Sequence, residues 1–188
     1  QTNAQLELLA PETAQAIVRA CDRLLEGEHA DQFPVDVYQT GSGTSTNMNV
    51  NEVVAHLASE DSSQMVGAND QVNMSQSSND VIPTAIHLSS ALAFNNRLLP
   101  ALRHLESVLE DRAQPLNKVV KTGRTHLMDA MPVTLGQELR GWAAQVHDNR
   151  KRLCQHLDQL CQLAQGGTAV GTGVNAHPDF ADQFARQI

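Results

Sequence analysis

Three short polar segments of this chain carry residue types that bind small, oxygen-rich anions. They cover residues 41–49, 75–80 and 123–126. Hydroxyl and amide side chains donate hydrogen bonds without needing a counter-charge, and glycines let backbone N–H groups approach a ligand closely. The third segment adds a cation, Arg124, and an imidazole, His126, which suits a general base or a group that holds a water. The pattern predicts a small-anion site assembled from distant parts of the chain.

Each segment also has a simpler structural interpretation. Gly, Ser, Thr and Asn in residues 41–49 are common in loops, and neither a P-loop nor a dinucleotide-binding motif is present. Residues 77–80 directly precede a predicted helix, where Ser, Asn and Asp serve as caps; a helix N-terminus also attracts anions, so both interpretations stay open. The glycine-rich residues 166–173 either end a helix or form a second loop that approaches a ligand closely.

The composition favours an all-α protein. The 188 residues are 41% hydrophobic but only 3% aromatic, which favours helices packed on helices over a β-sandwich. The net charge of −8, with no basic stripe, argues against nucleic acid or a membrane surface as a partner. No apolar run approaches the roughly 18 residues that span a bilayer, so we expect a cytoplasmic protein. The three cysteines are expected to be buried free thiols, and no metal-ligand spacing occurs, so we expect no metal.

Apolar periodicity predicts the helices and the places where they end. The expected helices cover residues 11–27, 51–59, a long stretch from Pro83 to about residue 109 with a kink at Pro100, and about 135–164. Residues 28–50 are predicted as a loop and 112–134 as a connector, without strands. We expect residues 1–78 to be part of an N-terminal helical domain and 79–188 the first part of a central long-helix bundle. The long apolar seam predicts an oligomer.

Taken together, the segments resemble the class II fumarases of the fumarase/aspartase superfamily. The resemblance runs from about residue 33 to residue 188 in the family's order. The Thr125-His126 pair is similar to fumarases, whereas aspartases carry Gln after that Thr. The matching segments are residues 39–44 with 47–52, Ser75-Gln76-Ser77-Ser78-Asn79-Asp80, Gly123-Arg124-Thr125-His126-Leu127 with 129–130, Leu135-Gly136-Gln137-Glu138, and 166–175.

The resemblance implies a long-helix fold within an oligomeric superhelical bundle. It also implies the reaction that the protein catalyses. The reaction is reversible hydration of fumarate to L-malate, in the tricarboxylic acid cycle, with no cofactor or metal. The implied partners are fumarate, L-malate and further copies of the chain in a homotetramer, with sites that draw on three subunits. The implied catalytic residues are His126 and Thr125, which hold the water and contact substrate. The implied substrate-binding residues are Ser42, Thr44, Ser77, Ser78 and Asn79, and Asn69 and Asp70 match part of a secondary anion site.

The chain departs from the family pattern at two places. The secondary site usually reads His-Pro-Asn-Asp, but this chain has Gly67-Ala68-Asn69-Asp70, and Gln64 stands where a basic residue is common. The serine-rich mobile loop with its Met-Pro-Gly-Lys-x-Asn signature does not occur in the 188 residues. That loop carries the family's proposed base. We therefore expect a fragment that is inactive alone.

Two alternatives stay open at this point. One is aspartate ammonia-lyase or another lyase of the superfamily, which ammonia release from aspartate would reveal. The other is a non-catalytic helical scaffold that keeps the fold without the chemistry.

Overall fold

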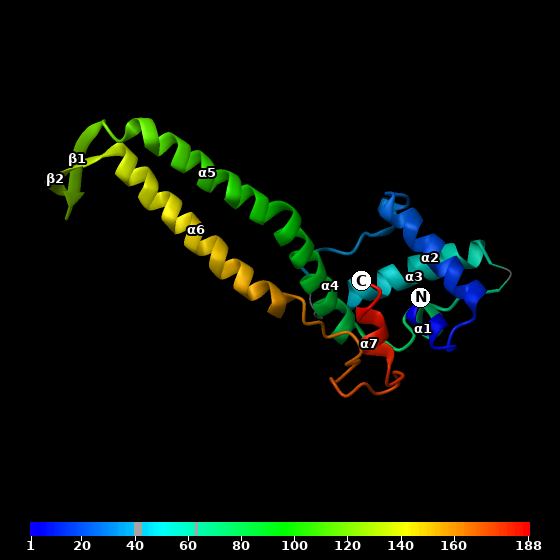
Figure 1. The fold of residues 1–188 in the computed structure, drawn as a ribbon. Helices are drawn as coiled ribbons and strands as arrows, with labels where there is room; N and C mark the ends of the chain where they lie inside the picture. The colour runs from blue at the N-terminus through cyan, green and yellow to red at the C-terminus, as the bar shows by residue number, and fades with distance from the viewer. Residues whose placement is uncertain (40–42, 63) are drawn as a thin grey trace. The chain divides into compact units, whose positions relative to one another are not determined.

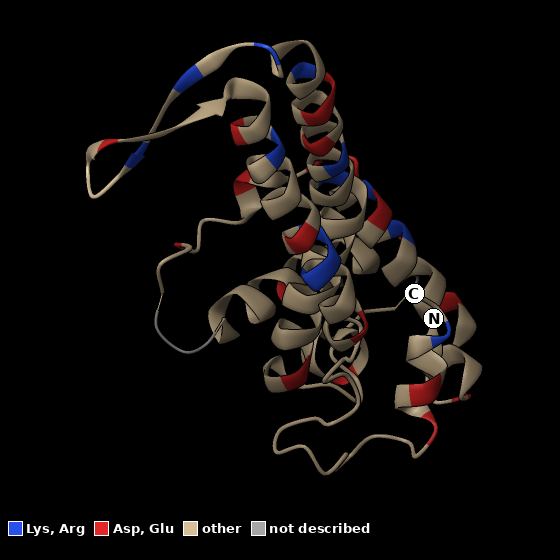
Figure 2. Cartoon of the chain, turned by 60° about the vertical axis from the view of Figure 1, so that its left-hand side comes forward, with Lys and Arg blue, Asp and Glu red and all other residues tan. Residues whose placement is uncertain are grey.

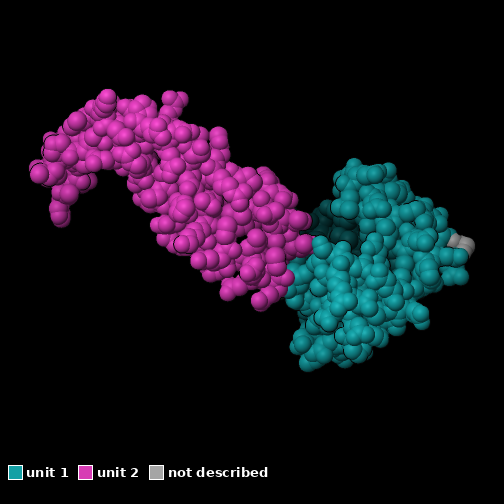
Figure 3. Space-filling view, viewed as in Figure 1, with its two compact units in different colours: residues 1–86, 163–188 teal, residues 87–162 magenta. Residues whose placement is uncertain are grey.

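The computed structural model describes residues 1–39, 43–62 and 64–188, which form two compact units (Figure 3). Unit 1 contains residues 1–86 and 163–188, and unit 2 contains residues 87–162. The predicted all-α class is confirmed, because helices dominate both units and the described residues form a single two-stranded sheet. The expected division after residue 78 into two family domains stays a prediction. Among the described residues, no helix combines the length and apolarity needed to cross a membrane.

Unit 1 is built from short and medium helices around an alanine-rich core. Ala16 and Ala20 of one helix pack against Val54, Leu57 and Ala58 of another. Small side chains let the two helices approach closely, and burying each larger aliphatic side chain contributes about 1.5–3 kcal/mol. The helices of this unit are α1 (Thr2–Gln5), α2 (Pro11–Leu25), α3 (Thr44–Glu60), the first part of α4 (Ser78–Ala93), and α7 (Phe180–Ala185), with the short turns η1 (Ala30–Gln32) and η2 (Ala68–Val72).

The start of α3 differs from the sequence prediction. Residues 44–50 were expected to be loop, but α3 already begins at Thr44. The apolar period is missing there because part of the buried face of α3 is polar: Asn47 and Asn51 are both buried. Their Nδ2 groups donate to Asn73 Oδ1 at 3.5 and 3.1 Å. By contrast, α2 begins at Pro11 and ends just before Gly27, as predicted.

Unit 2 is an antiparallel helix pair with a hairpin at one end (Figure 1). It contains the end of α4, η3 (Phe94–Leu98), α5 (Leu99–Leu116), β1 (Val120–Thr125), β2 (Met128–Thr134) and α6 (Leu135–Leu160). The 26 residues of α6 span about 39 Å. A capping box starts α6: Thr134 Oγ1 accepts from the Gln137 N–H at 3.1 Å, and Gln137 Oε1 accepts from the Thr134 N–H at 2.9 Å. The helix ends at Leu160, before the Gly166-Gly167 pair that was predicted to stop it.

The hairpin corrects the prediction that residues 112–134 lack strands. Residues 112–116 still belong to α5, and β1 pairs with β2 in antiparallel register. The strands escaped detection because both are mostly exposed and show no clean alternation of apolar and polar residues. A bulge interrupts the register at Gly123, where a Cβ atom would lie 2.6 Å from the Met131 carbonyl oxygen.

The predicted irregularity near Pro100 takes the form of a π-helical turn. Turn η3 covers the five residues before α5, and Pro100 lies in the first turn of α5. A proline ring collides with the carbonyl four residues earlier, here that of Asn96. Because a π-helical turn is wider than an α-helical one, it makes room at this point.

Charged residues of both signs lie along the helices of unit 2 (Figure 2), and ion pairs join α5 to α6. Glu106 on α5 accepts from Arg150 Nε at 3.0 Å and lies 2.7 Å from His147 Nδ1, both on α6. The Glu106 side chain is only 15% exposed. The hydrogen bond from Arg150 holds the pKa of the Glu106 carboxyl below its ordinary value, and the bond with His147 lowers it further.

Candidate active site

The N-termini of two helices meet in unit 1 through a pair of hydroxyls. Thr44 is the first residue of α3, and Ser78 is the first residue of α4. Their side-chain oxygens lie 3.0 Å apart. A Cβ on Gly43 would sit 3.1 Å from the Ile82 side chain of α4, so glycine suits this close approach. Helix N-termini carry partial positive charge and free N–H donors, so the meeting point favours an anion.

A hollow of about 310 Å³ lies beside this hydroxyl pair. The polar segments that the sequence singled out as 41–49, 75–80 and 166–175 all contribute to its wall. None of the described residues that line it has an ionisable side chain, so its chemistry rests on neutral donors and acceptors. Its size suits a small molecule. The lining residues are Asn47, Met48, Asn73, Ser75, Gln76, Ser77, Ser78, Thr168, Ala169, Val174 and Asn175.

The segment of residues 77–80 caps α4 and also forms part of the wall. Ser77 Oγ accepts from the Asn79 N–H at 3.2 Å, and Asp80 Oδ1 accepts from the Ser77 N–H at 2.9 Å. This confirms the capping interpretation. The Ser78 hydroxyl faces Thr44, and Asn79 Nδ2 donates to the Ala169 carbonyl at 2.7 Å. Capping and wall formation therefore occur in the same four residues.

Asp80 fastens the glycine-rich loop to the start of α4. Its carboxylate is only 1% exposed, and Oδ2 accepts from the Gly166 N–H at 3.1 Å and from the Thr168 N–H at 2.8 Å. The sequence assigned Asp80 to a cap alone and missed this second role. No local signal could have found it, because these partners lie 86 and 88 residues away. Residues 166–173 do not end α6, which stops at Leu160, so the helix-stop prediction is wrong; the close approach of this loop to a ligand stays a prediction.

A chain of amide side chains, several of which line the hollow, links the segments that form the wall. Asn73 Oδ1 accepts from the amides of α3 described above, and Asn73 Nδ2 donates to the Gln76 carbonyl at 3.3 Å. Gln165 Nε2 then donates to Gln76 Oε1 at 3.2 Å. These bonds link α3 to the segment before α4 and to the glycine-rich loop. Sequence reasoning missed them as well, because Asn and Gln indicated only loops.

The remaining predicted site residues lie elsewhere in the chain. Ser42 lies outside the described residues. Asn69 and Asp70 are exposed on η2 in unit 1. Thr125 and His126 belong to unit 2, so the hollow of unit 1 is described without them.

His126 lies at the tip of the hairpin. Thr125 pairs with Met128, so His126 and Leu127 form a two-residue turn. Their φ angles of +50° and +61° are typical of a type I′ turn, which usually takes Asn and Gly. The His126 side chain is exposed, and Arg124 and Asp129 form an ion pair across the strands at 3.4 Å. The hairpin therefore presents the imidazole to solvent on a tight turn.

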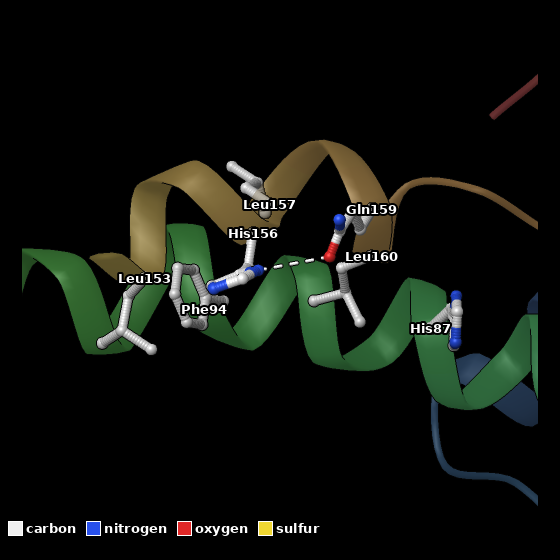
Figure 4. A pocket seen from close by; sticks show the side chains of 7 residues that line it. All are labelled: His87, Phe94, Leu153, His156, Leu157, Gln159 and Leu160. Atoms are coloured by element: carbon white, nitrogen blue, oxygen red, sulfur yellow. Dashed lines mark hydrogen bonds between the residues drawn. The ribbon is translucent and has the colours of Figure 1, made fainter. Parts of the chain in front are cut away.

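A second hollow, in unit 2, is mostly apolar (Figure 4). It has a volume of about 280 Å³ between the helix that carries His87 and Phe94 and the C-terminal end of α6. His87 Nδ1 donates to the Gln162 carbonyl at 2.8 Å, and His156 Nδ1 donates to Gln159 Oε1 at 3.2 Å. Apart from the two histidines and Gln159, the lining is apolar: Phe94, Leu153, Leu157 and Leu160. An anion would lose its hydration there without enough donors to replace it, so the hollow of unit 1 is the better candidate.

The whole chain, residues 1–188, matches the family model described as Lyase, so the chain belongs to this lyase family. It is 54% identical over 188 residues to "Fumarate hydratase class II 2" of Pseudomonas aeruginosa, covering 100% of this chain and 41% of that protein. It is 50% identical over 194 residues to "Fumarate hydratase class II" of Yersinia pestis, covering 100% of this chain and 42% of that protein. The predicted resemblance to class II fumarases is thus confirmed.

The fold agrees with a solved structure of the same kind. The recombinant class II fumarase from Schistosoma mansoni superposes with a TM-score of 0.91 at 44% identity, over 97% of this chain and 39% of that one. The chain therefore spans about two fifths of the length of these relatives.

Proposed function

We propose that this chain supplies one wall of a dicarboxylate site in a class II fumarate hydratase, which adds water reversibly to fumarate to give L-malate. The observation that carries the proposal is the Thr44–Ser78 hydroxyl pair at two helix N-termini, 3.0 Å apart beside a small hollow. Hydroxyls and N–H groups held this way fit a carboxylate. The names of the relatives supply the reaction.

Hydration of fumarate places the water oxygen on C2 and a proton on C3. In the reverse direction, removal of the C3 proton leaves negative charge that spreads onto the adjoining carboxylate. Fixed donors around that carboxylate therefore stabilise the transition state more than the ground state. In this proposal Ser42 and Thr44 bind one carboxylate, and Ser77, Ser78 and Asn79 form a second group of contacts. Thr125 and His126 contact substrate and hold the water.

The described wall is not a complete site. The described residues that line the hollow include no ionisable side chain, whereas fumarate brings two negative charges. We assign the balancing cation and the base that removes the C3 proton to other parts of the assembly, including the further subunits of a homotetramer. Exposed apolar side chains in unit 2 support such an assembly: Leu105 is 45% exposed, Trp142 51% and Leu127 96%. The proposal also includes a secondary anion site at Asn69 and Asp70 and a role in the tricarboxylic acid cycle in the cytoplasm.

A chimera tests the proposal. Residues 1–188 would replace the matching 41% of the Pseudomonas aeruginosa relative, and the loss of fumarate absorbance would be followed without added cofactor and with a chelator present. We expect hydration by the chimera and none by the 188-residue chain alone. His126→Asn in the chimera should lower kcat by about 10²-fold or more, because misplacing a reacting group, here the water, costs about that much. Its melting temperature should stay close to that of the parent.

The outcomes separate the alternatives. A folded chimera that releases ammonia from aspartate but leaves fumarate untouched would identify an aspartate ammonia-lyase. A folded chimera without either activity would identify a scaffold. Wild-type turnover by the His126→Asn variant would exclude the water-holding role while leaving the reaction itself in place.

A further inference from the structure

Thr168 combines two unfavourable features at the wall of the hollow. It is 5% exposed, and among the described residues its Oγ1 has no hydrogen-bond partner. A buried polar group without a partner destabilises the folded state. Its φ angle is +57°, and Thr168 is the β-branched residue among the described non-glycine residues with positive φ. For a β-branched side chain this conformation is an outlier, and such outliers gather at functional sites.

The surrounding structure holds Thr168 in this conformation. Asp80 Oδ2 accepts from the Thr168 N–H at 2.8 Å and from the Gly166 N–H at 3.1 Å. One residue further along, the Ala169 carbonyl accepts from Asn79 Nδ2 at 2.7 Å. Hydrogen bonds to a buried carboxylate are stronger than those between neutral groups. The loop backbone is therefore fixed on both sides of the Thr168 side chain by the segment that also carries Ser78.

We propose that Thr168 is a further contact for the substrate and that Asp80 is the positioning residue that holds it there. This inference rests on the function proposed above. The hydroxyl that lacks a partner belongs to a residue that lines the hollow together with Ser77 and Ser78. A hydroxyl can donate to a carboxylate without carrying charge, which suits a wall whose described residues include no cation. In this proposal, a carboxylate oxygen of the substrate accepts a hydrogen bond from Thr168 Oγ1.

If the Thr168 hydroxyl only stabilised the fold, removing it would lower the melting temperature. A substrate contact predicts a different result. Thr168→Val keeps the shape and the β-branch but removes the hydroxyl without a partner, so it should leave the melting temperature unchanged or raise it. Thr168→Ser keeps the hydroxyl and removes the branch. If the hydroxyl contacts substrate, Thr168→Val in the chimera should raise KM about 10-fold or more, while Thr168→Ser stays close to the parent. Thr172→Val, at an exposed threonine of the same loop, is the matched control.

Asp80→Asn tests the positioning role. In the 188-residue chain, we expect exchange of the Gly166 and Thr168 amide hydrogens to become about 10-fold faster or more, because the amide N–H₂ cannot accept the bonds that Oδ2 accepts. In the chimera, KM should rise and kcat should fall together, whereas partial unfolding would lower kcat alone. Asp182→Asn, at an exposed carboxylate of α7, is the matched control. If Asp80→Asn does not fold, the comparison of Thr168→Val with Thr168→Ser still tests whether the hydroxyl contacts substrate.

The results distinguish this inference from the proposed function. An active parent chimera in which Thr168→Val keeps KM within about twofold would overturn the inference alone, as would equal increases for Thr168→Val and Thr168→Ser. An inactive but folded parent chimera would overturn the proposed function and this inference with it. A rise in KM for Thr168→Val, with Thr168→Ser and Thr172→Val unaffected and no loss of melting temperature, is the expected result.

Discussion

Gly166→Ala is the substitution whose cost the structure defines most closely. Gly166 has a φ angle of +97°, and a Cβ there would lie 2.6 Å from the Ala181 Cβ and 3.1 Å from the Ala181 Cα of α7. Backbone atoms and a methyl group cannot rotate away from the new atom. An L-residue in the left-handed region costs about 1–2 kcal/mol, and overpacking costs about 1–3 kcal/mol. We therefore expect Gly166→Ala to destabilise unit 1 by about 2–5 kcal/mol.

Gly171→Ala is the matched control for the backbone contribution. Gly171 has a φ angle of +83° in the same loop, but a Cβ there would meet nothing within 4 Å. It should cost about 1–2 kcal/mol, so the difference between the two variants isolates the contact with α7. The assay is native-state amide hydrogen exchange in unit 1, at Phe180 for α7 and at Ala58 for the core. If Gly166→Ala lowered the free energy of unfolding by no more than Gly171→Ala does, the close packing of the loop on α7 would be refuted.

Three further predictions concern stability and thiol chemistry. The pKa of Glu106 is lowered in the folded state, chiefly by the hydrogen bond from Arg150. The pair therefore stabilises unit 2 above the unfolded pKa of the carboxyl, about 4.3, and this contribution is lost as the pH falls through the lower folded pKa. In urea unfolding followed by Trp142 fluorescence, Glu106→Gln should lower the free energy of unfolding more at pH 7 than at pH 2. Thr134→Ala removes half of the capping box of α6 and should cost about 0.5–2 kcal/mol in the same assay, with no change in the slope against urea. Burial raises the pKa of the Cys21 thiol, so a chromogenic disulfide reagent should label the two exposed cysteines quickly and Cys21 slowly; three equal rates would contradict this.

The sequence predicted the helices wherever apolar residues pack against a neighbour within the chain. The period that starts at Pro11 gave α2, and the one that starts at Leu135 gave α6, because each stripe faces a partner helix. The period failed at the start of α3, where Asn47 and Asn51 are buried in place of aliphatic residues. Amides that bind another amide in the interior look like loop residues when only hydrophobicity is read.

Cysteines and strands show the second limit of sequence reasoning. Cys154 and Cys161 were expected to be buried, but both are exposed, and only Cys21 is partly buried. Burial depends on which face of α6 meets α5, and a seven-residue spacing fixes only that the two thiols share a face. The hairpin strands were missed for a related reason: their side chains pack on little within the chain, so no alternation of burial marks them.

The sequence predicted several residues of the candidate site, but it did not predict how they are held together in space. The family resemblance named Thr44 and Ser78, within segments that their residue types had singled out, and the structure brings their hydroxyls together. Asp80, Thr168 and the amide chain of the wall were not named as site residues. Their partners lie far away in sequence, and a buried carboxylate bound only to N–H groups resembles an ordinary cap. Local patterns therefore identified the groups that could touch a ligand and missed those that hold them in place.

The proposed function places an electrostatic demand on the wall that its described residues do not meet. Asp80, the ionised group fastened behind the hollow, accepts three backbone N–H bonds and adds negative charge to a chain with 21 acidic and 13 basic side chains. Neutral donors and two helix N-termini can orient a dicarboxylate, but each helix end contributes only about half a charge. Two carboxylates bring two full charges into this field. In the proposed site, the wall discriminates between ligands by hydrogen-bond geometry, and we assign the affinity for the dianion to cations outside the described lining of the hollow.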